Sequence, residues 1–192
     1  MVKLLLASSS IYRKELLSRL KIPFTTFSPE VDESHLPGEP WETMVLRLSE
    51  EKALCAAKLY PDSVCIGSDA VAALDHTFFG KPLTHEVAKA QLAIMSDQVV
   101  TYYTGVCVAA PFLHYVKCKL VPTKVKFRPL SAQIIENYLL KEKPYYSAGS
   151  FKSETLGSAL IEHVESEDPT AIIGLPLISL CDMLSEVGIT IL

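Results

Sequence analysis

The segment from Leu4 to Leu17 constrains the fold of this chain most strongly. A short apolar run at 4–7 is followed by three consecutive serines and then by a basic, amphipathic segment. An apolar run of this length is typical of a buried strand, and serine is a preferred residue at a helix N-terminus. The order therefore predicts a strand that turns directly into a helix.

The serine turn has two interpretations, which the local sequence leaves open. Backbone N–H groups in the first turn of a helix have no intrahelical partner, and the helix dipole favours negative charge there. The hydroxyls of Ser8 and Ser10 and the guanidinium of Arg13 could join those N–H groups in holding a phosphate. Alternatively, one of the serines serves only as the helix N-cap.

The remainder of the chain alternates between strand and helix patterns. Strands are predicted at 2–7, 24–27, 63–74, 99–109, 114–127 and 160–164, and helices at 11–20, 41–60, 84–95, 131–141 and 177–187. This interleaving predicts an α/β fold with a mixed sheet. With 192 residues, 49% of them hydrophobic, the chain can form a single domain over 1–192, or two closely joined lobes.

Composition narrows the class of function and the compartment. The net charge of −4 argues against binding to a nucleic-acid polymer, which requires a basic face. No apolar run approaches the length of a membrane span, and the apolar run near the N-terminus is too short for a signal peptide. The five cysteines are scattered and form no C-x-x-C pair, which predicts reduced thiols and a cytoplasmic location. They are Cys55, Cys65, Cys107, Cys118 and Cys181.

Three further segments have the residue types of a binding or catalytic site. Asp69 directly follows a glycine and a serine in an apolar strand, where an unpaired buried carboxylate would be costly, so we expect a strand end, a metal or a cation beside it. Lys81 stands between a glycine and a proline, and the small residues of 148–154 permit close approach of the backbone to a ligand. Each segment alone also has an ordinary structural interpretation. Asp69 could lie in a surface turn, Lys81 in a β-turn, and 148–154 in a mobile surface loop.

Eight motifs occur in a specific order over nearly the whole chain. They are Leu6-Ala7-Ser8-Ser9-Ser10 with Arg13 and Glu15-Leu16-Leu17, Val31-Asp32-Glu33, Glu51-Lys52-Ala53, Gly67-Ser68-Asp69, Gly80-Lys81-Pro82, Thr104-Gly105-Val106, Ala148-Gly149 and Gly174-Leu175-Pro176-Leu177. This set resembles the Maf family of nucleoside triphosphate pyrophosphatases. The resemblance implies a mixed, twisted α/β sheet flanked by helices, two lobes around a cleft, and a homodimer.

The resemblance also implies a reaction and roles for individual residues. Maf-like enzymes cleave a nucleoside triphosphate between its α- and β-phosphates, with Mg²⁺ or Mn²⁺ as cofactor. Asp69 matches the catalytic carboxylate, which activates the attacking water directly or as a metal ligand, and Glu33 is a candidate second metal ligand. The positions that match the phosphate site are Ser8, Ser10, Arg13, Lys52 and Lys81, with Lys152 as a weaker match.

Two residues resemble the branch of the family that hydrolyses 7-methyl-GTP. They are Tyr12 and Glu154, where the pyrimidine-nucleotide branch has arginine and glutamine. Methylation at N7 makes guanine cationic, and an aromatic face attracts a cation by roughly 0.5–2 kcal/mol. A carboxylate can accept hydrogen bonds from both N1–H and N2–H₂ of guanine. Without the resemblance, Tyr12 would be interpreted as a helix-packing residue and Glu154 as a solvated loop charge.

The chain departs from this branch at a few positions. Ala70 follows Asp69 where the branch has glutamine, which puts selectivity in doubt more than activity. Ile11 replaces a proline, and Ser96-Asp97 replaces a Ser-Gly pair. Two alternative functions are a nucleotide-sensing regulator of cell division and septum formation with little turnover, and a pyrophosphatase for dTTP or UTP. The retained carboxylate at Asp69 favours an enzyme, since pure binding would not require it beside the phosphates.

Overall fold

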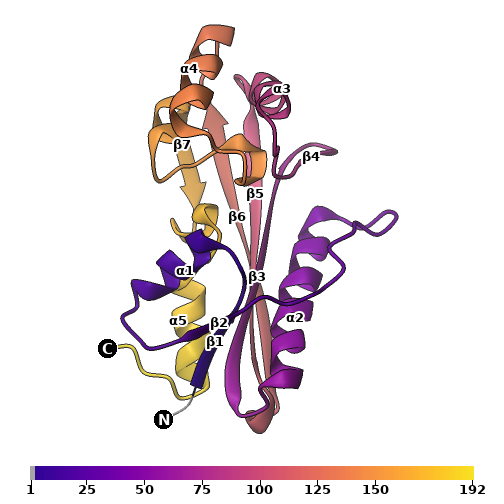
Figure 1. Ribbon diagram of the computed structural model, residues 1–192, viewed down its shortest axis with the longest axis vertical. Helices are drawn as coiled ribbons and strands as arrows, with labels where there is room; N and C mark the ends of the chain where they lie inside the picture. Colours follow the sequence, from indigo (N-terminus) through magenta and orange to yellow (C-terminus); the bar gives the residue numbers. More distant parts are fainter. Residues whose placement is uncertain (1–2) are drawn as a thin grey trace. The chain divides into compact units, whose positions relative to one another are not determined.

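The computed structural model describes residues 3–192 and has the predicted mixed α/β fold (Figure 1). The strands are β1 (Lys3–Ala7), β2 (Thr25–Phe27), β3 (Ser63–Leu74), β4 (Thr77–Phe79), β5 (Val99–Ala110), β6 (Tyr115–Phe127) and β7 (Ile161–Ser166). The helices are α1 (Ile11–Ser18), α2 (Trp41–Leu59), α3 (His85–Met95), α4 (Ala132–Glu142) and α5 (Leu177–Glu186). The short 3₁₀ turns are η1 (Pro111–Leu113), η2 (Ala148–Ser150), η3 (Leu156–Leu160) and η4 (Ala171–Ile173).

The sheet has the strand order β2-β1-β3-β5-β6-β7, with β4 paired to β3. Strand β1 runs parallel to β2 and β3, whereas the pairs β3–β4 and β6–β7 are antiparallel, so the sheet is mixed. All predicted helices and strands are present with small shifts at their ends, although Val2 lies outside the described residues. The three-residue strand β4 was not predicted. No helix within residues 3–192 combines the length and the apolar character needed to cross a membrane.

The chain divides into two compact units. Unit 1 contains the residues up to Asp69 together with 104–121 and 168–192, and unit 2 contains 70–103 and 122–167. Because β3, β5 and β6 are long, each of them contributes residues to both units. Asp69, at the end of the first part of unit 1, is followed directly by Ala70 of unit 2.

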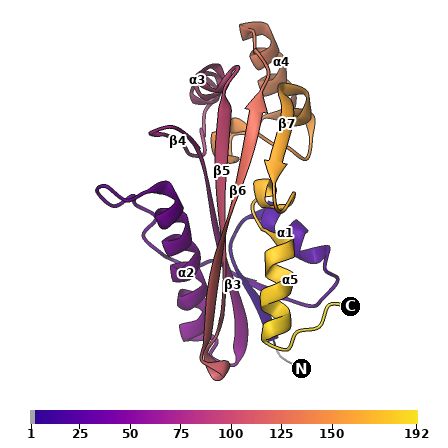
Figure 2. The same ribbon diagram turned by 180° about the vertical axis from the view of Figure 1, so that it is seen from behind.

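In unit 1, helices cover both faces of the strands: α1 and α5 lie on one face and α2 on the other (Figures 1 and 2). The alternation of side chains along a strand explains this arrangement. Leu4 and Leu6 of β1 pack with apolar residues of α1 and α5, whereas Leu5 and Ala7 pack with alanines of α2. The partners are Leu16, Leu17, Leu180 and Leu184 on the first face, and Ala53, Ala56 and Ala57 on the second.

In unit 2, helix α3 contacts both α4 and η2. Its N-cap is Thr84, whose hydroxyl accepts a hydrogen bond from the backbone N–H of Val87. Ser131 caps α4 in the same way. The buried residues of α3 recur at the spacing of one helix face, so this helix is fixed by packing as well as by its cap.

The prediction that all five cysteines are reduced thiols is wrong for two of them. Cys107 on β5 and Cys118 on β6 form a disulfide, with their Cα atoms 4.0 Å apart. The spacing of the cysteines along the chain did not reveal this pair. Strands β5 and β6, which are joined at η1, bring together two cysteines that are separated in sequence. Cys55, Cys65 and Cys181 are free, and burial raises the pKa of the Cys65 thiol to about 11.

Candidate active site

Helix α2 packs very closely onto β3 and β5 because glycines face it. A Cβ atom on Gly67 would lie 2.1 Å from the carbonyl oxygen of Ser49 and 2.5 Å from the backbone nitrogen of Ala53. A Cβ atom on Gly105 would lie 2.5 Å from the Ser49 hydroxyl. Real Cβ atoms do not approach other heavy atoms so closely, so a side chain at either position would force α2 or its side chains to shift. The close packing brings Lys52 of α2 beside the residues that follow Gly67 on β3.

Lys52 lies between two carboxylates. Its Nζ atom is 2.6 Å from Oε1 of Glu33 and 2.6 Å from Oδ1 of Asp69. The Lys52 side chain is 7% exposed and that of Asp69 is 14% exposed, so both depend on paired charges in place of water. The Ser49 hydroxyl accepts a hydrogen bond from the backbone N–H of Asp69 at 2.9 Å. The structure therefore brings together three residues that the sequence placed in the site.

The serine turn before α1 is built around two hydroxyls. The Ser10 hydroxyl accepts a hydrogen bond from the backbone N–H of Arg13 at 3.4 Å, which makes Ser10 the N-cap of α1. The Ser8 hydroxyl accepts from the Ser10 N–H at 3.1 Å and from Nη1 of Arg13 at 3.5 Å. The capping interpretation is thus confirmed for Ser10, and phosphate binding by this turn stays a prediction.

The carbonyl of Gly174 connects the serine turn to the middle of β3. It accepts hydrogen bonds from Nε of Arg13 and from the Ser68 hydroxyl, both at 2.9 Å. Burial lowers the pKa of the Arg13 guanidinium, and the charges of Asp69 and Glu33 act in the opposite direction. Arginine remains charged in either case, so Arg13 is a fixed cation on which the charges of both carboxylates act.

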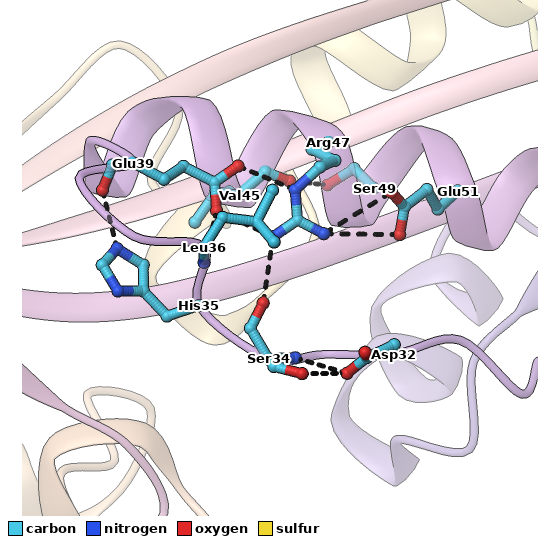
Figure 3. A network of polar contacts seen from close by, with 9 residues as sticks. All are labelled: Asp32, Ser34, His35, Leu36, Glu39, Val45, Arg47, Ser49 and Glu51. Carbon is cyan, nitrogen blue, oxygen red and sulfur yellow. Dashed lines mark hydrogen bonds and ion pairs between the residues drawn. The ribbon is translucent and has the colours of Figure 1, made fainter.

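The loop at 28–40 is held against α2 by Arg47 (Figure 3). Nε and Nη2 of Arg47 donate to the two carboxylate oxygens of Glu39, each at 2.7 Å, and Nη2 also donates to the carbonyl of Ser34 at 3.1 Å. Glu51 contacts the guanidinium from the next turn of the helix. Hydrogen bonding from Arg47 lowers the pKa of Glu39. Since Ser34 follows Glu33 directly, this Arg47 network fixes the backbone beside Glu33.

The two carboxylates of Glu33 and Asp69 are suitable donors for a divalent cation. Both contact the same ammonium, so their oxygens converge on one point. Within residues 3–192, no group of three or more His, Cys, Asp or Glu side chains could hold a metal ion. Mg²⁺ in phosphate-processing sites is held by one or two carboxylates and completes its coordination with phosphate oxygens and water. The donor set therefore fits a cation that binds together with a phosphate.

In unit 2, Gln91 of α3 joins two loops that carry predicted site residues. Its Nε2 donates to the carbonyl of Gly80 at 3.2 Å, and its Oε1 accepts from the Ser150 hydroxyl at 2.5 Å. The backbone N–H of Gly149 also donates to the Gly80 carbonyl, at 3.2 Å. These hydrogen bonds, here called the Gln91 network, hold Gly80 in position. Lys81, the next residue, is exposed.

The other predicted site residues occupy different environments. In unit 2, Nζ of Lys152 is paired with Oε1 of Glu142 at 3.1 Å, and Glu154 is exposed. Burial raises the pKa of Glu142, but hydrogen bonds from Lys152 and its neighbours outweigh this and lower it. Ala70 in unit 2 and Tyr12 in unit 1 are half-buried. Their roles toward a nucleotide stay predictions.

Sequence reasoning missed Arg47 and Gln91. A basic residue on a helix that follows an acidic loop was the available signal for Arg47. For Gln91 there was none, because its partners are 11 and 59 residues away along the chain.

Comparison with known proteins agrees with the resemblance inferred from the motifs. A family model described as Maf-like protein matches residues 3–187, and the chain belongs to this family. Relatives named 7-methyl-GTP pyrophosphatase match over the full length. The protein of Nitrosospira multiformis is 48% identical over 98% of this chain and 96% of its own length. Those of Methylobacillus flagellatus and Pseudomonas syringae pv. tomato are 47% and 48% identical over 100% of both chains.

Proposed function

We propose that this protein hydrolyses 7-methyl-GTP to 7-methyl-GMP and pyrophosphate. The observation that carries the reaction type is the paired, mostly buried Lys52 and Asp69 beside the Arg13 turn in a chain of the Maf family. The substrate is supported by full-length relatives that bear the name 7-methyl-GTP pyrophosphatase.

The phosphate chain is bound by cations and hydroxyl groups of unit 1. A nucleoside triphosphate carries about four negative charges, which must be opposed by fixed donors if the transition state is to be stabilised. Arg13 and Lys52 supply positive charge, and Ser8 and Ser10 supply hydroxyl groups beside the α1 N-terminus. Lys81 and, more weakly, Lys152 match positions that serve the same task in the Maf family.

Asp69 activates the water that attacks the triphosphate. Its carboxylate accepts a proton from the water while the water oxygen forms a bond to phosphorus. The bridge between the α- and β-phosphates breaks, and pyrophosphate leaves. Asp69 and Glu33 are the residues that would hold Mg²⁺ or Mn²⁺, and a bound ion would supply positive charge to oppose the charge that develops on the phosphates. The Ser49 hydroxyl, which accepts a hydrogen bond from the Asp69 backbone N–H, holds the backbone of Asp69 in place for this step.

Tyr12, Glu154 and Ala70 select the base. The ring of Tyr12 stacks on the cationic 7-methylguanine, and the Glu154 carboxylate accepts from N1–H and N2–H₂. Ala70 leaves more space beside Asp69 than the glutamine of related enzymes would.

A panel of nucleotides tests the proposal. With Mg²⁺ or Mn²⁺ and detection of pyrophosphate, we expect kcat/KM to be highest for 7-methyl-GTP among 7-methyl-GTP, GTP, dTTP and UTP. A preference for dTTP or UTP would refute the substrate assignment. Absence of turnover on all four would refute the enzymatic function and favour a nucleotide-sensing regulator.

We also propose that the protein acts as a homodimer in the cytoplasm. Light scattering after size-exclusion chromatography tests the dimer: a mass of one chain at micromolar concentration would contradict it.

A further inference from the structure

The position of Lys52 points to an order of binding. We infer that Lys52 occupies, in the free protein, the place between Glu33 and Asp69 that a divalent cation takes during the reaction. Lys52 must therefore leave both carboxylates before they can share a cation, and the triphosphate is what draws it away. This exchange rests on the proposed function, because it assumes that the site binds a triphosphate and a cation together.

The distances in the site place Lys52 and a shared cation close enough to compete for the same two oxygens. Nζ of Lys52 is 2.6 Å from an oxygen of each carboxylate. Mg²⁺ binds oxygen at about 2.0–2.1 Å, so an ion bonded to both of these oxygens would lie within about 4 Å of Nζ. Two cations this close repel one another strongly where water is largely excluded, and Lys52 is 7% exposed.

The balance of charges in the site also indicates that Lys52 leaves the carboxylates when a divalent cation binds. In the free protein, the cations Arg13 and Lys52 balance the carboxylates Glu33 and Asp69. A divalent ion added alone would leave two positive charges uncompensated beside Lys52 and Asp69, whose side chains are mostly buried, whereas the Glu33 side chain is 61% exposed. A triphosphate brings about four negative charges and offers Lys52 new oxygen partners at the moment it gives up the carboxylates.

Lys52 is better placed than Arg13 to change partner. The Arg13 guanidinium is already fixed by the Gly174 carbonyl and the Ser8 hydroxyl. Lysine carries its charge on a flexible four-carbon stem and can redirect three donors without disturbing the helix. The free protein should therefore bind a divalent cation weakly, and removal of the Lys52 charge should open the carboxylates to it.

Binding of Mn²⁺ without nucleotide tests the exchange. We expect Lys52→Met to bind Mn²⁺ about tenfold or more tightly than the unaltered protein, as measured by the electron paramagnetic resonance signal of free Mn²⁺. Adding Glu33→Gln to Lys52→Met should remove this gain. Lys58→Met, at an exposed position on the same helix, is the matched control and should leave Mn²⁺ affinity unchanged.

Thermal unfolding gives a second readout, which also covers a poorly folded variant. Lys52→Met leaves two carboxylates without their counter-ion, so its Tm should fall and Mn²⁺ should raise it more than it raises that of the unaltered protein. Lys52→Gln serves for the same comparison if the methionine variant does not fold. Affinity for Mn²⁺ that is no tighter in the folded variants than in the unaltered protein would overturn the exchange. This readout needs no turnover, so an inactive nucleotide panel together with a gain in Mn²⁺ affinity would refute the substrate and leave the exchange standing.

Discussion

Helix α2 in unit 1 and helix α3 in unit 2 do the same task by different chemistry. Each uses one side chain to hold loops that carry predicted site residues. Arg47 of α2 holds the loop of Glu33 through charged contacts, mainly to Glu39, and the Arg47 side chain itself is 21% exposed. Gln91 of α3 holds its loops through neutral hydrogen bonds, one of them to Ser150, whose side chain is fully buried.

The difference determines how each loop responds to its surroundings. Contacts between partly exposed charges weaken gradually with salt and with protonation of the carboxylate. A buried hydrogen bond between neutral groups does not weaken with salt or with protonation of a carboxylate. If one partner is lost, the other is left buried without a hydrogen bond. The loop of Glu33 is thus held adjustably, which suits a carboxylate that exchanges its counter-ion, whereas the loop at 148–150 is held rigidly.

The largest expected effect comes from neither network but from the reacting group itself. Asp69→Asn keeps the size of the side chain and loses the base, so kcat should fall by about 10²- to 10⁴-fold while nucleotide affinity remains measurable. Steady-state kinetics and equilibrium binding of 7-methyl-GTP give the two numbers. Asp62→Asn, in the exposed turn before β3, is the matched control. A near-normal kcat for Asp69→Asn would show that the carboxylate does not activate the water.

The Gln91 network should show the larger effect of the two networks. Ser150→Ala removes the hydroxyl that Gln91 accepts from, and should lower the free energy of unfolding by about 1–3 kcal/mol. KM for 7-methyl-GTP should rise as well, because the loop that precedes Glu154 loses its anchor. Urea unfolding and steady-state kinetics measure both effects.

A companion variant separates the hydroxyl from the backbone at the same position. Ser150 has a φ of +58°, in the left-handed region that favours glycine. Ser150→Gly also lacks the hydroxyl but adopts this φ readily, so it should be more stable than Ser150→Ala by about 1 kcal/mol. Equal stability of Ser150→Ala and the unaltered protein would contradict the role assigned to Gln91.

The sequence predicted the elements well, but it predicted the candidate site residues only one by one, without their contacts. Apolar periodicity and the capping serines before α1 are local signals, so they located helices without knowledge of the fold. That Lys52 lies between Glu33 and Asp69 depends on two glycines that admit α2 to the sheet. The Cys107–Cys118 disulfide depends likewise on strand pairing, which the spacing of cysteines does not encode.

The Arg47 network should give a smaller, pH-dependent effect. The pKa of Glu39 in the folded protein is lowered from 4.5 by hydrogen bonding from Arg47, so its contribution to stability is present above about pH 4.5 and is lost as the pH falls through the lowered value. Arg47→Met should therefore be less stable than the unaltered protein at pH 7, and the gap should narrow in acid and in high salt.

Urea unfolding across this pH range measures the gap, with Lys58→Met as the control that should follow the unaltered protein. The Mn²⁺ affinity of Lys52→Met should also fall modestly when Arg47→Met is added, because Glu33 is then less well positioned. A gap that is constant with pH would mean that Arg47 acts by packing its stem and not by pairing with Glu39.

The smallest expected effect is at Asp97, which shares a left-handed backbone with Ser150 but is exposed. Its φ is +60°, and Lys126 donates to both its carboxylate and its carbonyl at 2.6 Å. Asp97→Gly relieves about 1 kcal/mol of backbone strain and loses an exposed ion pair of about 0–1 kcal/mol, so its stability should change little. Asp97→Ala loses the same pair and keeps the strain, so it should be the less stable of the two.

If urea unfolding gives the same difference between glycine and alanine at positions 97 and 150, backbone strain alone explains it. A larger difference at 150 would mean that the buried site also resists the added Cβ atom.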